Sequence, residues 1–190
     1  MNIYNRNRII DDLQSALSPK RYRHTIRVEK TALSLASIYD ANSHKCSIAA
    51  LLHDCAKDIP KELQIKLCKD YHLEIEEPKK YNEVIHSFLG VEIAKREYNI
   101  QDSTVLNAIK YHTTGRPNME LIEKIIFVSD YIEPSRKSIP NIDEIRKLAN
   151  IDIDQAILMI VNNNIEFLNT KCKKIYYLTR DTKEYYERVK

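Results

Sequence analysis

Apolar side chains recur every three or four residues along most of this 190-residue chain, which is the spacing of a packed helix. The stretch 22–39 shows the pattern clearly. Its apolar residues that fall broadly on one side of a helix are Ile26, Val28, Leu33, Leu35 and Ile38. Comparable stretches follow one another toward the carboxyl end. The pattern predicts about eight to ten helices that pack together as one compact all-α unit.

Polar residues and prolines mark the predicted helix starts. Ser18 before Pro19 is typical of an N-cap followed by proline at the first helical position. Other predicted starts are Ser43, Pro60, a position near Val84, Asp102 or Ser103, Pro117, Asn141 with Glu144 as a capping box, and Asp152 with Gln155 as a second capping box.

The same signals predict where the helices end. We expect helices over about 60–71, 84–98, 102–114, 117–130 and 152–169, with Gly115 as a C-terminal glycine. Residues 72–83, which contain Pro78 and many charges, are predicted to form a loop. The tail carries Tyr176, Tyr177, Tyr185 and Tyr186. These rings either stack on a base or cover the core with their hydroxyl groups in contact with water, and the second interpretation is the more common one.

Composition narrows the class of protein. The chain has only two glycines, and sheet-rich folds normally need many glycine turns, so helices joined by short links are favoured. The net charge of +3 is too small to indicate a polyanion partner by itself, and the basic residues are interleaved with 27 acids. A nucleic-acid-binding protein is therefore disfavoured. A nucleotide-binding role of the Walker type is excluded because there is no glycine-rich phosphate loop.

Cysteine usage and the termini predict a cytoplasmic protein. The four cysteines form no C-x-x-C pair and are expected to be reduced thiols. The amino-terminal residues lack the apolar segment of a signal peptide, and no apolar run approaches the roughly 20 residues that a membrane span needs.

The candidate chemistry lies in four histidines and two aspartates. They are His24, His53, Asp54, His86, His112 and Asp130. These residues come from five different predicted helices, so the fold can bring them together. Imidazole and carboxylate donors suit iron, manganese, zinc and similar divalent ions, and the two oxygens of Asp54 can bridge two ions. His44 and His72 fall outside this pattern and are expected at the surface.

The surroundings of two of these residues support a buried site. An apolar run at 48–52 leads into His53, and another at 125–128 precedes Asp130. A buried aspartate is costly unless it is paired or binds a metal. A lone histidine on an apolar helix is more often a hydrogen-bonded core residue than a ligand, but the joint set favours a metal site.

At these residues the chain resembles the HD-domain phosphohydrolase superfamily. The resemblance lies in the segments 23–28, 53–58, 86–90, 112–117 and 129–136. Within the superfamily the chain looks like the bacterial YqeK family over nearly its whole length, including 142–146 and the carboxyl-terminal helix. Ser135 departs from that family, in which a glycine is common at this position.

The resemblance implies a fold, an activity and a ligand set. It implies a single HD domain over 1–190, with a metal-binding core at about 18–136 and a C-terminal helical extension at 137–190. The implied activity is symmetrical hydrolysis of diadenosine tetraphosphate to two ADP. One or two iron ions are implied as cofactor, with manganese, cobalt, zinc or magnesium as alternatives. His24, His53, Asp54 and Asp130 would hold one metal, and His86 and His112 would complete a second site or contact phosphate oxygens.

The expected reaction is attack on phosphorus by hydroxide formed at the metal, with His53, Asp54 and Lys57 as catalytic residues. Expected substrate contacts, besides His86, His112 and Lys57, are Arg27, Arg116 and Arg136 as phosphate donors, Thr113 and Thr114 through hydrogen bonds, and Asp58. For each basic residue, the alternative is a solubilising surface charge.

Other functions stay open at this point. Another HD-type nucleotide phosphohydrolase, such as one acting on deoxynucleotides, is the first alternative. Guanosine tetraphosphate hydrolases are disfavoured because Lys57 and Asp58 occupy the region of their glutamate-aspartate pair, and the Gly-Tyr-Pro signature of cyclic-dinucleotide phosphodiesterases is absent. A non-catalytic nucleotide-sensing module is the second alternative. The predicted partners are a dinucleoside polyphosphate, its ADP product and a second copy in a homodimer, with no nucleic acid and no membrane.

Overall fold

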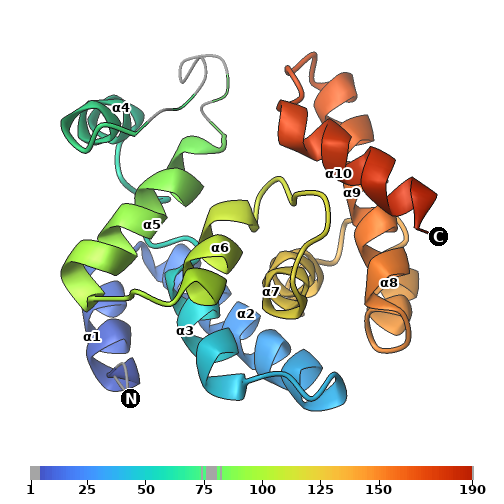
Figure 1. Ribbon diagram of the computed structural model, residues 1–190, viewed down its shortest axis with the longest axis horizontal. Helices are drawn as coiled ribbons and strands as arrows, with labels where there is room; N and C mark the ends of the chain where they lie inside the picture. The colour runs from blue at the N-terminus through green and yellow to red at the C-terminus, as the bar shows by residue number, and fades with distance from the viewer. Residues whose placement is uncertain (1–4, 74, 76–80, 82, 190) are drawn as a thin grey trace.

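The computed structural model describes residues 5–73, 75, 81 and 83–189, and within this part it contains ten helices and no strand (Figure 1). The helices are α1 (Arg6–Ala16), α2 (Pro19–Ile38), α3 (Ser43–Leu52), α4 (Lys61–Asp70), α5 (Ile85–Tyr98), α6 (Ser103–Tyr111), α7 (Leu121–Ile132), α8 (Ile142–Ala149), α9 (Ile153–Thr170) and α10 (Tyr177–Arg188). The prediction of an all-α fold is confirmed.

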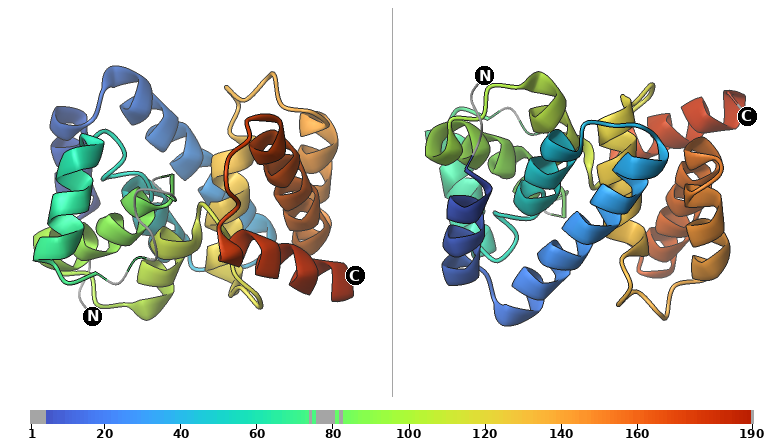
Figure 2. Two further views of the ribbon diagram at one scale, coloured as in Figure 1. Left: turned by 90° about the horizontal axis from the view of Figure 1, so that it is seen from above. Right: turned by 90° about the horizontal axis from the view of Figure 1, so that it is seen from below.

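Helix α7 lies between two groups of helices. Figures 1 and 2 show α8, α9 and α10 together on one side of it and α1, α4 and α5 on the other. Helix α2 packs against α3 and α7, α6 packs against α3, α5 and α7, and α9 packs against α7, α8 and α10. Fully buried side chains such as Ile48, Leu51, Ile109 and Ile125 fill the space between α3, α6 and α7. This core fixes the helices from which the candidate site is built.

Several predicted helix starts are confirmed by their caps. Ser18 accepts a hydrogen bond from the Arg21 amide, and Pro19 is the first residue of α2. Asp102 caps α6 by accepting from the amide of Thr104. Asp152 caps α9 by accepting from the amides of Asp154 and Gln155. In each case a short polar side chain satisfies an amide that the helix itself leaves unpaired.

Three predicted starts are wrong in detail. The cap of α3 is Asn42 rather than Ser43. Helix α7 begins at Leu121, four residues after Pro117, because the intervening turn passes through Asn118 in a left-handed conformation. Asn141 also has a positive φ of 55° and makes no side-chain cap, so its predicted capping box with Glu144 does not form.

The buried stripe of α2 also differs from the prediction. Ile38 is 48% exposed, whereas Glu29, a polar residue, is buried. Glu29 accepts two hydrogen bonds from the Arg6 guanidinium, at 2.6 and 2.8 Å, and one from the Ser47 hydroxyl at 2.6 Å. These contacts offset the cost of burying the charge and tie α1 to α2 and α3.

Two further expectations concern loops and the tail. The predicted loop at 72–83, with Pro78, lies largely outside the described residues. Among the tail tyrosines, Tyr186 is buried in the core, while Tyr176 is buried and lines the cavity described below. No helix in the described part of the chain combines the length and the hydropathy of a bilayer span.

The turn after α6 is fastened to α10 through Gly115. Gly115 has a φ of +65°, and a Cβ placed there would lie 2.7 Å from the Thr182 methyl group. The Thr182 hydroxyl in turn donates to the carbonyl of Thr114. This close contact joins the last helix to the segment that directly follows His112.

Gly115→Ala is expected to lower the free energy of unfolding by about 2 kcal/mol, because it adds left-handed backbone strain and a clash with Thr182. Urea unfolding followed by circular dichroism measures the loss. Gly90→Ala in α5 is the comparison: its backbone is helical, and an added Cβ would lie 3.3 Å from the Ile109 methyl group, so a smaller loss of about 1 kcal/mol is expected there. A Gly115→Ala protein as stable as the wild type would contradict the proposed fastening.

Candidate metal centre

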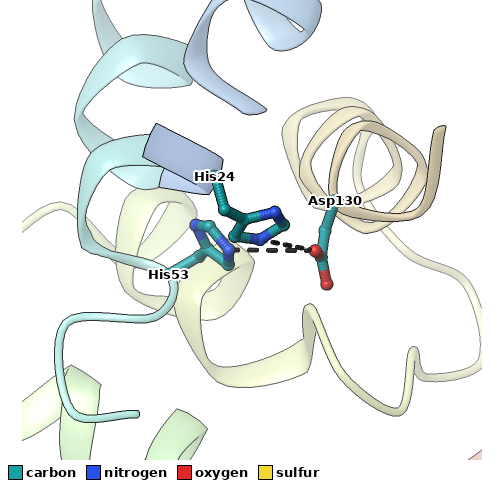
Figure 3. A group of neighbouring side chains, drawn as sticks. All are labelled: His24, His53 and Asp130. Atoms are coloured by element: carbon teal, nitrogen blue, oxygen red, sulfur yellow. Dashed lines mark ion pairs between the residues drawn. The ribbon is translucent and has the colours of Figure 1, made fainter. Parts of the chain in front are cut away.

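All six predicted ligand residues meet at one place in the fold. His24 lies on α2, His53 and Asp54 directly follow α3, His86 lies on α5, His112 directly follows α6, and Asp130 lies on α7. Figure 3 shows His24, His53 and Asp130 facing one another. His24 Nε2 lies 3.0 Å from Asp130 Oδ1, and His53 Nε2 lies 4.0 Å from the same oxygen.

The Asp54 carboxylate lies between two pairs of imidazoles. Its Oδ2 is 3.7 Å from His24 Nε2 and 3.5 Å from His53 Nε2. Its Oδ1 is 3.2 Å from His86 Nε2 and 3.5 Å from His112 Nε2. Each of the two carboxylate oxygens therefore faces one pair of imidazoles. This arrangement suits a carboxylate that bridges two neighbouring cation positions.

Helix ends fix the orientation of two imidazoles. His53 Nδ1 lies 2.6 Å from the carbonyl oxygen of Ala50, and His112 Nδ1 lies 2.8 Å from that of Ile109. A carbonyl oxygen only accepts, so Nδ1 carries the proton in both rings. Each Nε2 faces the cluster, and a metal ion would be bound through this second ring nitrogen.

The charges in the cluster are strongly coupled. Burial by itself would raise the pKa of Asp54, but the surrounding imidazoles hold that pKa well below its usual range. Asp130 behaves in the same way, with its pKa lowered against the effect of burial by His24 and His53. Burial and the nearby Lys57 ammonium lower the pKa of His86 to about 4, so this ring is neutral near pH 7.

A third carboxylate lies behind His24. Glu133 directly follows α7, and its side chain is 1% exposed. Its carboxylate accepts hydrogen bonds from His24 Nδ1 at 3.2 Å and from Arg27 Nε at 2.7 Å. Burial raises the pKa of Glu133, but the hydrogen bonds from Arg27 and Ser135 outweigh it and bring the pKa to about 2. Glu133 is therefore ionised near neutral pH.

The cluster has donor atoms of the kinds that bind metals, and some of them lack a hydrogen-bond partner within the described residues. His24 Nε2 and His53 Nε2 are buried and have no hydrogen-bond partner within the described residues, although both lie near carboxylates. The potential ligand atoms of His24, His53 and Asp130 all lie within 4.8 Å of one another, as do those of His53, Asp54 and His112. Buried polar atoms without partners are costly, and a divalent cation would satisfy them. The residues present therefore fit a divalent metal.

A large cavity opens from the cluster toward the C-terminal helices. Its volume is about 1190 Å³, and its wall includes Asp54, His112 and Asp130 at one end. Three cations that line it lie close to the acids. Arg21 Nη1 is 2.5 Å from Asp54 Oδ2, and Arg136 Nη2 is 3.3 Å from Asp130 Oδ1. Lys57 Nζ is 3.3 Å from both ring nitrogens of His86. These groups place positive charge beside the cluster.

Two threonines complete this end of the cavity. The Thr113 hydroxyl lies 3.1 Å from His112 Nε2 and 3.3 Å from His86 Nε2. Thr114 also lines the cavity, but it is buried and its hydroxyl donates to the carbonyl of Gly115. The Thr113 hydroxyl therefore faces the imidazoles of His86 and His112, whereas the Thr114 hydroxyl is engaged with a backbone carbonyl.

Three other predicted phosphate or substrate contacts are engaged elsewhere. Arg27 donates to Glu133 and to the Ser135 hydroxyl, and Arg116 makes two hydrogen bonds of 2.7 Å with the buried Glu123. Asp58 accepts from the amide of Ser18. None of the three lines the cavity, so their predicted substrate contacts stay predictions. His44 and His72 are exposed, as expected.

Two residues that touch the cluster were not predicted from the sequence. Arg21 lies three residues before His24, and Glu133 lies three residues after Asp130. Residues at this spacing share one face of a helix, so their proximity to the ligands could have been predicted from spacing alone. The polar residues Asn163 and Asn164 of α9, which line the far end of the cavity, carry no comparable local signal.

Comparison with known proteins agrees with this geometry. A model of the HD domain matches residues 21–135. A Bacillus subtilis protein named bis(5'-nucleosyl)-tetraphosphatase, symmetrical, is 39% identical over 172 residues, which cover 90% of this chain and 92% of that protein. A Staphylococcus aureus protein of the same name is 40% identical over 198 residues, which cover 100% of this chain and 99% of that protein.

A solved structure has the same fold throughout. A crystal structure from Clostridium acetobutylicum, described as a predicted HD superfamily hydrolase involved in NAD metabolism, superposes with a TM-score of 0.94. It is 39% identical in sequence and covers 100% of both chains. This chain therefore belongs to the HD-domain family and groups there with the bacterial proteins named symmetrical bis(5'-nucleosyl)-tetraphosphatase.

Proposed function

We propose that this chain is a metal-dependent phosphoric anhydride hydrolase that converts diadenosine tetraphosphate and water into two ADP. The observation that carries the proposal is the Asp54 carboxylate, placed between two histidine pairs at the end of a cation-lined cavity. Relatives that align with nearly the whole chain carry the name of this symmetrical tetraphosphatase. The broken bond is the central anhydride, and the water oxygen enters one of the two new terminal phosphates.

The residues divide into two sets of ligands. His24, His53, Asp54 and Asp130 would hold one divalent ion, and His86 and His112 would share Asp54 to hold a second or would contact phosphate oxygens. A bound divalent ion polarises a phosphoryl oxygen and lowers the pKa of water toward neutrality. His53 and His112 would bind the ion through Nε2, because their Nδ1 protons are held by backbone carbonyls.

The cations around the ligands would bind the polyphosphate. Arg21, Lys57 and Arg136 line the same cavity wall, so a tetraphosphate chain that reaches the cluster passes them. Arginine offers a planar fork to phosphate oxygens, and lysine offers a compact point charge. Lys57 Nζ lies close to the His86 ring, and we infer that its ammonium would stabilise the charge that develops on the leaving phosphate.

The C-terminal helices would complete the substrate site. We infer that residues 1–190 act as one unit, in which the core at about 18–136 supplies the ligands and the extension at 137–190 supplies the far cavity wall. Asn163, Asn164 and Phe167 of α9 line that wall, together with Tyr131 of α7. Amide groups and aromatic rings are suited to hydrogen-bond and stack on a nucleoside.

Iron is the metal that we propose, on the basis of the family resemblance and the donor set. Four imidazoles and two carboxylates suit iron, manganese, cobalt and zinc, whereas magnesium prefers oxygen donors and retains its waters. We also infer a reducing cytoplasmic setting, because all four cysteines are free thiols and three of them are buried.

Metal-loaded protein is expected to turn one diadenosine tetraphosphate into two ADP and nothing else. Removal of the metal with a chelator should abolish turnover, and Fe²⁺ added without oxygen should restore it. Products are separated by ion-exchange chromatography, with metal analysis of protein purified with and without air. Release of ATP and AMP, or release of nucleosides from deoxynucleotides in the same panel, would replace this function by another hydrolase. Tight nucleotide binding without formation of any product would indicate a non-catalytic nucleotide-sensing module instead.

Asp54→Ala is expected to abolish both metal binding and turnover, because it removes the only carboxylate that faces both histidine pairs among the described residues. Metal content per chain and ADP release are the two measurements. Asp143→Ala, which removes an acid that is 86% exposed on α8, is the control and should match the wild type in both. Retained turnover in Asp54→Ala would refute the role assigned to this residue.

Lys57→Met should lower kcat by about 100-fold while metal content stays at the wild-type level, because a preorganised donor to the phosphate chain is lost. Steady-state kinetics with metal-reconstituted protein tests this. Lys183→Met, on α10 outside the cavity lining, is the matched charge change and should leave kcat unchanged. A Lys57→Met enzyme with normal kcat would show that this ammonium is only a surface charge.

A further inference from the structure

Glu133 is a buried residue whose two carboxylate oxygens have different hydrogen-bond partners. Oε2 accepts from Arg27 Nε at 2.7 Å and from the Ser135 amide at 2.8 Å. Oε1 accepts from His24 Nδ1 at 3.2 Å and from the Ser135 hydroxyl. The charge is therefore balanced on one side by Arg27, while the other side faces the imidazole of a candidate metal ligand.

His24 needs such an acceptor because of where it lies. His53 and His112 directly follow helices, and their Nδ1 atoms donate to backbone carbonyls three residues earlier. His24 lies inside α2, where backbone carbonyls are already engaged by the helix. A side chain from another element must therefore hold its Nδ1 proton, and Glu133 at the end of α7 does so.

The hydrogen bond from Nδ1 decides what the other ring nitrogen does. A carboxylate oxygen cannot donate, so Nδ1 of His24 carries a proton, and with that proton held by Glu133 a metal ion would be bound through the lone pair of Nε2. That Nε2 is buried without a hydrogen-bond partner and lies 3.0 Å from Asp130 Oδ1. The ring is thus held in the tautomer and orientation that a metal ligand requires.

The C-terminal helices brace this arrangement. Arg146 of α8 donates to the carbonyl oxygens of Ile132 at 3.1 Å, Glu133 at 3.2 Å and Arg136 at 3.0 Å. These three bonds fix the backbone of the segment that carries Glu133. The position of the carboxylate is consequently set by helices on both sides of α7.

We propose that Glu133 is a positioning residue for the metal centre, which acts by holding His24 with its Nε2 directed at the ion. The inference rests on the proposed metal centre, but it does not depend on which nucleotide the enzyme cleaves. Glu133 would then contribute to metal affinity and would not only pair with Arg27.

Metal affinity in a double-mutant cycle tests this proposal. Co²⁺ is titrated into metal-free wild type, Glu133→Gln, His24→Ala and the double variant, in competition with a chromophoric chelator. Glu133→Gln should weaken Co²⁺ binding by about 10–100-fold. In the His24→Ala background, the same substitution should change the affinity by less than about 2-fold, because its effect passes through the missing ring. A visible Co²⁺ spectrum altered alike by Glu133→Gln and His24→Ala is also expected.

Glu29→Gln is the matched control for loss of a buried charge. Glu29 lies on the same helix as His24, is equally buried and pairs with Arg6 and Ser47, without contact to the cluster. It should lower stability in urea and leave Co²⁺ affinity as in the wild type. Folded Glu133→Gln with wild-type affinity, or an equal loss in the presence and absence of His24, would overturn the proposal.

A measurement on the unmodified chain decides the matter if Glu133→Gln does not fold. Long-range ¹H–¹⁵N spectra of the histidine rings report the tautomer, and the His24 signals are assigned by their loss in His24→Ala. The Nδ1–H form is expected in the Zn²⁺-loaded protein, and an Nε2–H form of His24 would overturn the proposal. Neither experiment uses diadenosine tetraphosphate, so a protein that binds metal but cleaves another substrate would contradict the proposed function alone.

Discussion

The Asp54 carboxylate, buried at 3% exposure, is the constraint on which the rest of this structure depends. A buried carboxylate is stable only when charges and hydrogen-bond donors surround it, because water cannot reach it. Here four imidazoles and Arg21 converge on its two oxygens. Convergence from α2, α3, α5 and α6 requires these helices to pack at fixed positions. The apolar core of α3, α6 and α7 therefore has a functional consequence, since a shift of one helix would remove a partner from this buried charge.

The chain fixes its imidazoles by two different means. Where a histidine follows a helix, as His53 and His112 do, the last turn supplies a free carbonyl and no further residue is needed. Where the histidine lies within a helix, as His24 does, the acceptor comes from another part of the chain. A residue that ends one helix thus becomes necessary for a ligand on another, which explains why α2 and the end of α7 must be held together.

Local signals predicted much of the fold, and long-range contacts account for most of what they missed. Ser18, Asp102 and Asp152 cap helices as their sequence neighbours indicate. The apolar run before His53 correctly predicts burial of that histidine, whereas Asp130, after the second run, is partly buried. The roles of Arg27 and Arg116 could not be read locally, because the acids that bind them, Glu133 and Glu123, are selected by tertiary packing. For the same reason, the burial of Glu29 contradicts the apolar stripe predicted for α2.

Charge balance links binding of the substrate to the state of the ligand cluster. Asp54 and Asp130 lie at the end of the cavity, and both are held ionised. Two carboxylates at this point repel a polyphosphate, and Arg21 and Arg136 offset part of their charge. Divalent cations held by the imidazoles and carboxylates would offset more of it. The same ligand set would then govern affinity for an anionic chain as well as the chemistry that follows, because both depend on the charge at this end of the cavity.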